Sequence, residues 1–105
     1  MTVSDKDADT VSKIMDIIGY ENITYLAVFE DDKLVFWSGM CKKPEIVDRL
    51  RELIREFKAT RVIFETEEGE AIIGQKDKNM ELFLIAKKDV AFTLFELIRS
   101  LLKRP

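Results

Sequence analysis

The side chains that most often carry out chemistry are scarce in this sequence of 105 residues. It has one cysteine, Cys41, and no histidine. Cys41 stands between Met40 and two lysines, just ahead of a predicted helix, and such a setting can activate a thiol. With no histidine to act as base and no second cysteine to form a disulfide, an idle thiol is favoured. A single thiol also fits a reducing compartment, so we expect a cytoplasmic protein.

Three carboxylates and four glycines are the remaining candidates for a binding site. Glu67, Glu68 and Glu70 could attract a cation, but acids at the tip of a hairpin more often keep it solvated. The glycines are not clustered, so no phosphate-binding loop is present, and the absence of histidine excludes the usual zinc sites. We therefore expect no enzyme, no metal and no cofactor.

Composition narrows the class of protein. The net charge is −3, from 17 basic and 20 acidic side chains that are interspersed along the chain. This balance argues against a nucleic-acid partner, which a basic domain would favour. No apolar run approaches the roughly 20 residues of a membrane span, and no signal peptide is visible, so we expect no membrane insertion. The length predicts a single domain over residues 1–105.

A run of three strands from Thr60 to Lys88 stands at the centre of the predicted fold. None of the three keeps one face polar throughout, which is typical of strands that are covered on both faces. Gly69 suits the end of a three-residue hairpin loop, where a left-handed residue is needed. The apolar runs of these strands are Val62–Phe64, Ala71–Ile73 and Leu82–Ala86.

Two further strands and three helices complete the pattern. Apolar residues recur at helical spacing in three segments, and Pro44 and Asp89 mark the starts of two of them. A first hairpin turns at Asp31-Asp32. In chain order we expect a helix (8–18), two strands (23–29 and 34–38), a helix (44–58), the three strands, and a last helix (89–102).

This order predicts an α/β (α+β) fold. We expect a three-layer sandwich, with one mostly antiparallel five-stranded sheet and helices on both faces, in the order α-β-β-α-β-β-β-α. Five strands span roughly 24 Å, whereas one helix is about 10 Å wide. A face that carries a single helix is therefore less than half covered, and the simplest cover is the same helix from a second copy related by a two-fold axis.

The element order and two segments of sequence resemble the Roadblock / dynein light chain family. ITYLAVFEDDKLVFWSG is similar to the first hairpin of that family, and TRVIFETEEGEAIIGQKDKNMELFLIAKKDVAFTLFELIRSLLK is similar to its last three strands and closing helix. The resemblance covers about Ala8 to Leu102. One departure is Asp31-Asp32-Lys33, where the family often places a glycine in the turn. The leading helix favours Roadblock over the related longin fold.

The resemblance implies a homodimer, or a heterodimer with a paralogue, that binds or regulates a small Ras-like GTPase or serves as an assembly scaffold. In the family, the second helix and the third strand of each copy pair across the two-fold axis. Here the third strand carries an apolar centre that would be an aggregation hazard if left without a partner.

The helical wheel of the second helix suggests which residues meet across the axis. Val47 and Ile54 lie at one margin of the apolar arc, beside long cationic side chains, whereas Ile46, Leu50, Leu53 and Phe57 are more central and should point into the sheet. We therefore predict that the helix seam is on the Val47 and Ile54 side. The predicted interface comprises Val47, Arg51, Ile54, Lys58, Arg61, Ile63 and Glu65.

Trp37 is a possible partner surface. Phe36 is expected to pack in the core under the first helix, so the neighbouring Trp37 must point to the opposite face, where it either fills the core or contacts a partner. An alternative function is a small-molecule sensor of the profilin-like or longin-like type, with a pocket between sheet and helix. A ligand pocket needs polar groups that point inward, whereas the inward positions here are Val, Ile, Leu and Phe. The interaction module is therefore favoured over the sensor.

Overall fold

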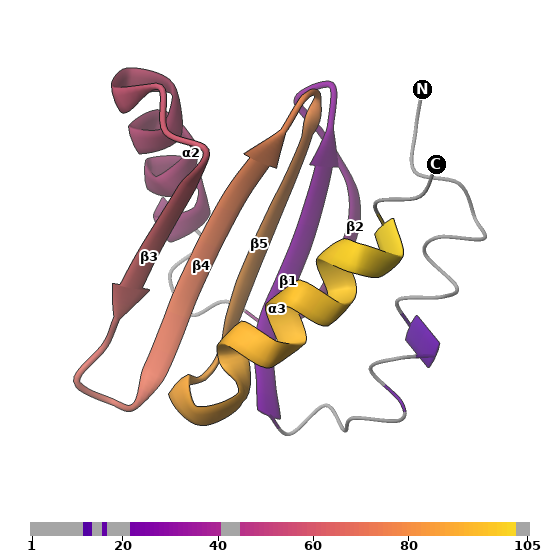
Figure 1. Ribbon diagram of the computed structural model, residues 1–105, viewed down its shortest axis with the longest axis vertical. Helices are drawn as coiled ribbons and strands as arrows, with labels where there is room; N and C mark the ends of the chain where they lie inside the picture. Colours follow the sequence, from indigo (N-terminus) through magenta and orange to yellow (C-terminus); the bar gives the residue numbers. More distant parts are fainter. Residues whose placement is uncertain (1–11, 14–15, 17–21, 41–44, 103–105) are drawn as a thin grey trace.

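The computed structural model describes residues 12–13, 16, 22–40 and 45–102, with side chains up to residue 100. Each element predicted within this part of the chain is confirmed, with bounds that differ by a few residues. Of the helix expected over 8–18, residues 12, 13 and 16 are helical, and the remainder lies outside the described residues. The described elements are β1 (Ile23–Glu30), β2 (Lys33–Gly39), α2 (Glu45–Phe57), β3 (Arg61–Glu65), β4 (Glu70–Asp77), β5 (Met80–Lys87) and α3 (Lys88–Leu102) (Figure 1).

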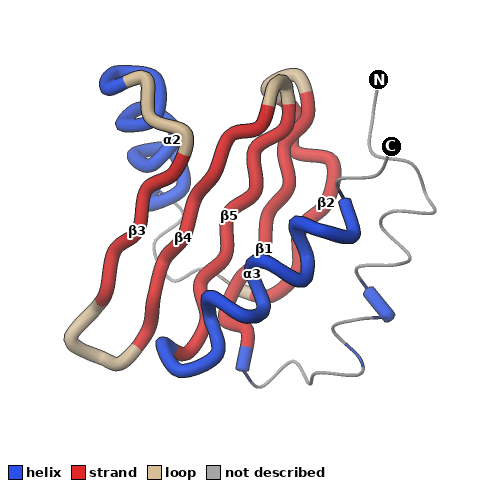
Figure 2. Tube along the Cα trace, in the orientation of Figure 1, coloured by secondary structure: helices blue, strands red, loops and turns tan. Residues whose placement is uncertain are grey.

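The five strands form one sheet in the order β2-β1-β5-β4-β3, and every neighbouring pair is antiparallel. Figure 2 shows the strands side by side, with β3 and β2 outermost. The chain reaches this order because β1–β2 and β3–β4–β5 are hairpin-connected units, and β5 returns to pair with β1. The predicted antiparallel α+β sheet is therefore confirmed.

The two faces of the sheet carry separate apolar cores, as the apolar character of both faces predicted. On one face α3 packs across β4 and β5 (Figure 1), and Phe95 and Ile98 meet Leu26, Ile73 and Leu84. On the other face α2 lies over β3 and β4, and its buried side chains meet a second group of sheet residues. That second group comprises Ala27, Ile72, Phe83 and Ile85.

The hairpin turns use residues in the left-handed conformation. Asp31 and Asp32 have φ of 53° and 67°, which gives the two-residue turn between β1 and β2 the mirror-image form that suits a twisted hairpin. Gly69 has φ 84°, and its N–H donates to the carbonyl of Thr66, so the predicted three-residue loop is confirmed.

Gly74 in β4 allows the face under α2 to close. A Cβ at this position would lie 2.7 Å from the ring of Phe83 on β5 and 3.3 Å from Val62 on β3. The ring therefore occupies the space that a side chain at residue 74 would fill. Phe83 is fully buried there, edge-on to Phe29 with ring centroids 5.8 Å apart.

The orientation of α2 differs from the one that the helical wheel predicted. Val47, Leu50 and Ile54 are the buried residues of the helix, and Ile54 is only 1% exposed. Ile46 and Leu53 are half-buried, and Phe57 is 71% exposed. The helix is thus rolled so that Val47 and Ile54 point into the sheet of their own chain, and the predicted orientation, with these two residues at the margin and Phe57 inward, is wrong.

Candidate interaction surfaces

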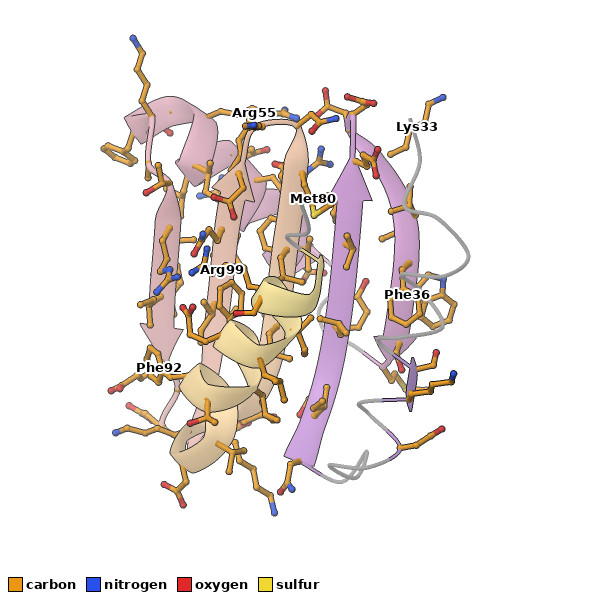
Figure 3. The ribbon with its side chains drawn as sticks, turned by 45° about the vertical axis from the view of Figure 1, so that its right-hand side comes forward. Lys33, Phe36, Arg55, Met80, Phe92 and Arg99 are labelled. Atoms are coloured by element: carbon orange, nitrogen blue, oxygen red, sulfur yellow. The ribbon has the colours of Figure 1, made fainter. Side chains whose placement is uncertain are left out.

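An apolar belt surrounds the β3 edge of the sheet. It consists of four large side chains from three elements: Phe57 at the end of α2, Ile63 and Phe64 in β3, and Phe92 in α3. Phe57 is 71% exposed, and the other three are between 41% and 46% exposed. Figure 3 shows Phe92 on the side of α3 that faces β3. Apolar surface gathered at one edge of a sheet is typical of an interface with another protein.

The belt has a part on each face of the sheet. Phe64 is paired with Ile72, which belongs to the core under α2, so Phe64 lies on the α2 face with Phe57. Ile63 is paired with Ile73, which belongs to the core under α3, so Ile63 lies on the α3 face with Phe92. A partner that extended the sheet beyond β3 would therefore cover apolar side chains on both faces.

The ends of β3 carry opposite charges. Arg61 donates through Nε to Oε1 of Gln75 (2.6 Å) and through Nη2 to Oε1 of Glu96 (2.8 Å), with its guanidinium carbon 5.3 Å from the ring centroid of Phe95. At the other end, Glu65 lies 3.4 Å from the ammonium of Lys88. Glu96 also accepts from Arg99, and these hydrogen bonds, that of Arg99 foremost, lower the pKa of Glu96 below its ordinary value of 4.5. The edge is therefore positive at its start and negative at its end.

Arg51, predicted to lie at the helix seam, is engaged by side chains of its own chain. Its Nε donates to Oε1 of Glu81 (2.8 Å), and its guanidinium carbon lies 4.2 Å from the ring centroid of Phe29. Its Nη2 also donates to Oδ1 of Asp32 (3.0 Å). The pairing satisfies a buried carboxylate in β5 and draws one side of α2 toward the β1–β2 hairpin.

The roll of the helix follows from these contacts. Because Arg51 faces the β1–β2 hairpin, the opposite side of α2, with Leu53 and Phe57, faces the β3 edge. Arg55 also donates to Asp32 (2.9 Å), and Figure 3 shows it at the same end of the sheet as Lys33. Lys58, also expected at the seam, is exposed and ends the helix with φ 53°.

A second apolar surface lies on the α2 face of the β1–β2 hairpin. Trp37 is paired with Ala27 and Leu34 with Phe29, and both of these β1 residues belong to or pack against the core under α2. Trp37 is 60% exposed, and Leu34 is exposed as well. Trp37 therefore lies on the predicted face but does not fill the core. Phe36 is half-buried against the core under α3.

Within the part of the chain that the structure describes, the residues considered as candidates for chemistry do not form a reactive site. Cys41 lies outside the described residues. Glu70 accepts a hydrogen bond from the hydroxyl of Thr24, and Glu67 and Glu68 are exposed at the hairpin tip. Across the described ranges, no group of three or more His, Cys, Asp or Glu side chains could hold a metal ion. Likewise, none of the helices in this part of the chain has the length and apolarity to cross a membrane.

Solved structures share this architecture. A Roadblock/LC7 domain from Streptomyces avermitilis superposes with a TM-score of 0.61 at 14% identity, covering 94% of this chain and 95% of that one. The chain has the Roadblock/LC7 fold. The gliding protein MglB from Thermus thermophilus is also similar, with a TM-score of 0.55 at 10% identity over 97% of this chain and 89% of that one. An MglB structure with a tetrameric arrangement matches at a TM-score of 0.57 and 10% identity, over 98% of this chain and 90% of that one. No protein-family model and no curated sequence matches the chain.

Two groups of site residues were missed from the sequence of this Roadblock-fold chain. Phe57 was expected to point into the sheet, yet it is exposed beside β3, and Phe92 of α3 was not recognised as part of this surface. The buried pair of Arg51 and Glu81 was also missed. A carboxylate within the apolar strand MELFLIAK was a signal for it, because a buried Glu needs a cationic or hydrogen-bonding partner.

Proposed function

We propose that this chain is a Roadblock-type interaction module, without enzymatic activity of its own, that works as a homodimer and binds a small Ras-like GTPase. The observation that carries the homodimer is the apolar belt of Phe57, Ile63, Phe64 and Phe92 around the open edge of β3. A second copy placed edge to edge would cover this belt on both faces of the sheet and bring the two α2 helices together on one face. Burial of large apolar side chains is the main favourable term in such an association.

The mass of the protein in solution tests the homodimer. Light scattering at micromolar concentration should give twice the chain mass of 12.2 kDa. Phe57→Glu should give a folded monomer, because the side chain is exposed in one copy and would be buried by the second. Met40→Glu is the matched control, since Met40 is also a large exposed side chain but stands at the end of β2. A wild-type monomer, or a Phe57→Glu dimer as tight as the wild type, would contradict the homodimer.

The GTPase part of the proposal comes from the resemblance to Roadblock proteins and is supported by the surface around Trp37 and Leu34. This surface lies on the same face as α2 but away from the β3 edge, so a dimer would leave it accessible. Exposed tryptophan on a rigid hairpin is a typical anchor of protein interfaces. The belt at β3 would therefore serve self-association, and the surface around Trp37 and Leu34 would serve partner binding.

Calorimetry with Ras-like GTPases from the same source, loaded with GDP or a GTP analogue, tests this part. Trp37→Ala should weaken binding by roughly 30-fold or more, as expected for an aromatic anchor, and leave the dimer mass unchanged. Thr93→Ala, an exposed substitution on α3, is the control. Equal binding by wild type and Trp37→Ala, or no binding by any of these GTPases, would contradict the assignment.

The polar groups in the interior of the described part do not favour the alternative function of a small-molecule sensor. The buried polar side chains of the described part include Gln75 and Glu81, and both are already paired with the chain's own arginines. No buried side-chain nitrogen or oxygen in that part is left without a hydrogen-bond partner. A ligand would therefore have to displace existing contacts to find a polar group.

A further inference from the structure

The backbone of β3 shows which of its residues offer hydrogen bonds to the open edge. On the side of β4, Thr66 N–H donates to the carbonyl of Glu70, and Lys76 N–H donates to the carbonyl of Thr60. In an antiparallel strand, successive residues direct their N–H and C=O groups to opposite sides. The even-numbered residues of β3 therefore face β4. Arg61, Ile63 and Glu65 direct their N–H and C=O groups to the open edge.

This alternation restricts how a second copy can pair with β3. An antiparallel ladder forms only when outward-facing residues of both strands stand opposite one another, so odd-numbered residues must meet odd-numbered residues. Registers in which Ile63 meets Val62 or Phe64 are thereby excluded. Of the registers that remain, only those with the two-fold axis at Val62, Ile63 or Phe64 set two or more outward-facing residues of each β3 opposite one another.

Charge separates these three registers. With the axis at Ile63, Arg61 of each copy stands opposite Glu65 of the other. With the axis at Val62 or at Phe64, Ile63 stands opposite Arg61 or opposite Glu65, and one charged residue of each strand has no partner within β3. Opposite charges placed directly across an antiparallel pair stabilise it, whereas an unmatched register loses this contribution. The axis at Ile63 also engages all three outward-facing residues of β3.

Side chains on both faces fit the same register. On the α2 face, Val62 would stand opposite Phe64 of the second copy, which is a favourable pairing of a β-branched and an aromatic side chain. On the α3 face, Ile63 would meet Ile63 of the second copy between two Arg61–Glu65 pairs. Arg61 can pair with Glu65 of the second copy and keep its contacts within its own chain. Gln75 and Glu96 engage only two of the five N–H donors of its guanidinium.

We propose that two copies of this chain pair their β3 strands about a two-fold axis at Ile63, with Arg61 of each copy opposite Glu65 of the other. This inference rests on the homodimer proposed above and specifies its register. The five residues RVIFE carry a positive charge at the start and a negative charge at the end. Two antiparallel copies of this strand therefore place opposite charges across from each other, so the strand can recognise a second copy of itself.

Charge variants test the pairing of Arg61 with Glu65. Glu65→Arg places two arginines opposite each other at both ends, and Arg61→Glu places two glutamates there, so each variant alone should dimerise at least about tenfold more weakly. A mixture of the two variants restores an opposite charge at every position and should form a heterodimer close to wild-type affinity. Two weakened variants that stay weak when mixed, or single variants as tight as the wild type, would overturn the proposed pairing.

Cysteine cross-linking tests the position of the axis and is independent of the charges. In a Cys41→Ser background, Ile63→Cys should form a disulfide-linked dimer on mild oxidation, because directly opposite residues lie at about the spacing that a disulfide needs. Val62→Cys and Phe64→Cys should not cross-link alone but should cross-link to each other when mixed. Cross-linking of Val62→Cys or Phe64→Cys alone would move the axis and overturn the register while leaving the homodimer in place. A monomer by light scattering would overturn the homodimer, and the register with it.

Discussion

The two outer strands of the sheet differ in how they are suited to meet another protein. β3 is short and regular against β4, with an apolar centre between Arg61 and Glu65. β2 is interrupted by a register shift against β1 and has no charged residue after Lys33. A bulge disrupts the row of outward-facing backbone groups, which discourages pairing along the edge. We infer that β3 meets a partner with its edge, whereas β2 presents the face that carries Leu34 and Trp37.

Gly39 shows how closely β2 is held against β1. A Cβ at Gly39 would lie 2.3 Å from the carbonyl oxygen of Thr24, and its φ of 88° is unfavourable for other residues. Trp37 is therefore carried by a hairpin that is fixed at both ends, at Gly39 and at the turn where Asp32 accepts from Arg51 and Arg55. A rigid support of this kind lowers the entropic cost of binding through an exposed aromatic side chain.

The largest expected effect is that of proline in β3, which tests the role of its edge. Ile63→Pro removes an N–H that points to the open edge, so one copy should remain folded while the dimer weakens by roughly 100-fold or more. Phe64→Pro is the control, because its N–H points to β4 and its loss should lower the melting temperature of the chain itself. Light scattering and thermal unfolding separate the two. Intact dimers of Ile63→Pro would show that β3 does not pair by its backbone.

An intermediate effect is expected where α2 is joined to the β1–β2 hairpin. Arg51→Ala leaves the carboxylate of Glu81 buried without its cation and should lower the free energy of unfolding by about 3 kcal/mol. Arg49→Ala, on the exposed side of the same helix, should change it by less than about 0.5 kcal/mol. Urea denaturation measures both. If the two variants were equally stable, Arg51 would not be what holds α2 in its observed roll.

The smallest expected effect concerns Glu96, which holds Arg61 at the start of β3. Its pKa is lowered in the folded chain, so its contribution to stability is present above the pKa of the unfolded chain and is lost as the pH falls through the folded value. Because the side chain is half exposed, the contribution should not exceed about 0.5 kcal/mol. Comparing wild type with Glu96→Gln in urea at about pH 7 and about pH 3 measures it. The wild type should be the more stable at the higher pH, and the difference should vanish at the lower one.

The sequence by itself determined the strands, the turns and the helices of the described part. The lack of a consistently polar face in the strands predicted apolar character on both faces of the sheet, and the glycine of EEG predicted a left-handed loop end. These features depend on residues that are close together along the chain. The charge pattern of β3 also lies within five consecutive residues. It can be recognised from the sequence once the outward-facing residues of the strand are known.

Only the tertiary structure decided the roll of α2 and, with it, which side of the helix faces the β3 edge. The apolar arc of the helix is broad enough to pack on a sheet in more than one orientation, so a helical wheel cannot choose between Val47 and Phe57. The choice depends on Arg51 meeting Glu81, 30 positions away in the sequence. A buried carboxylate must be paired with a cation wherever the fold places it. This requirement selects one orientation of the helix among those that its apolar arc alone would allow.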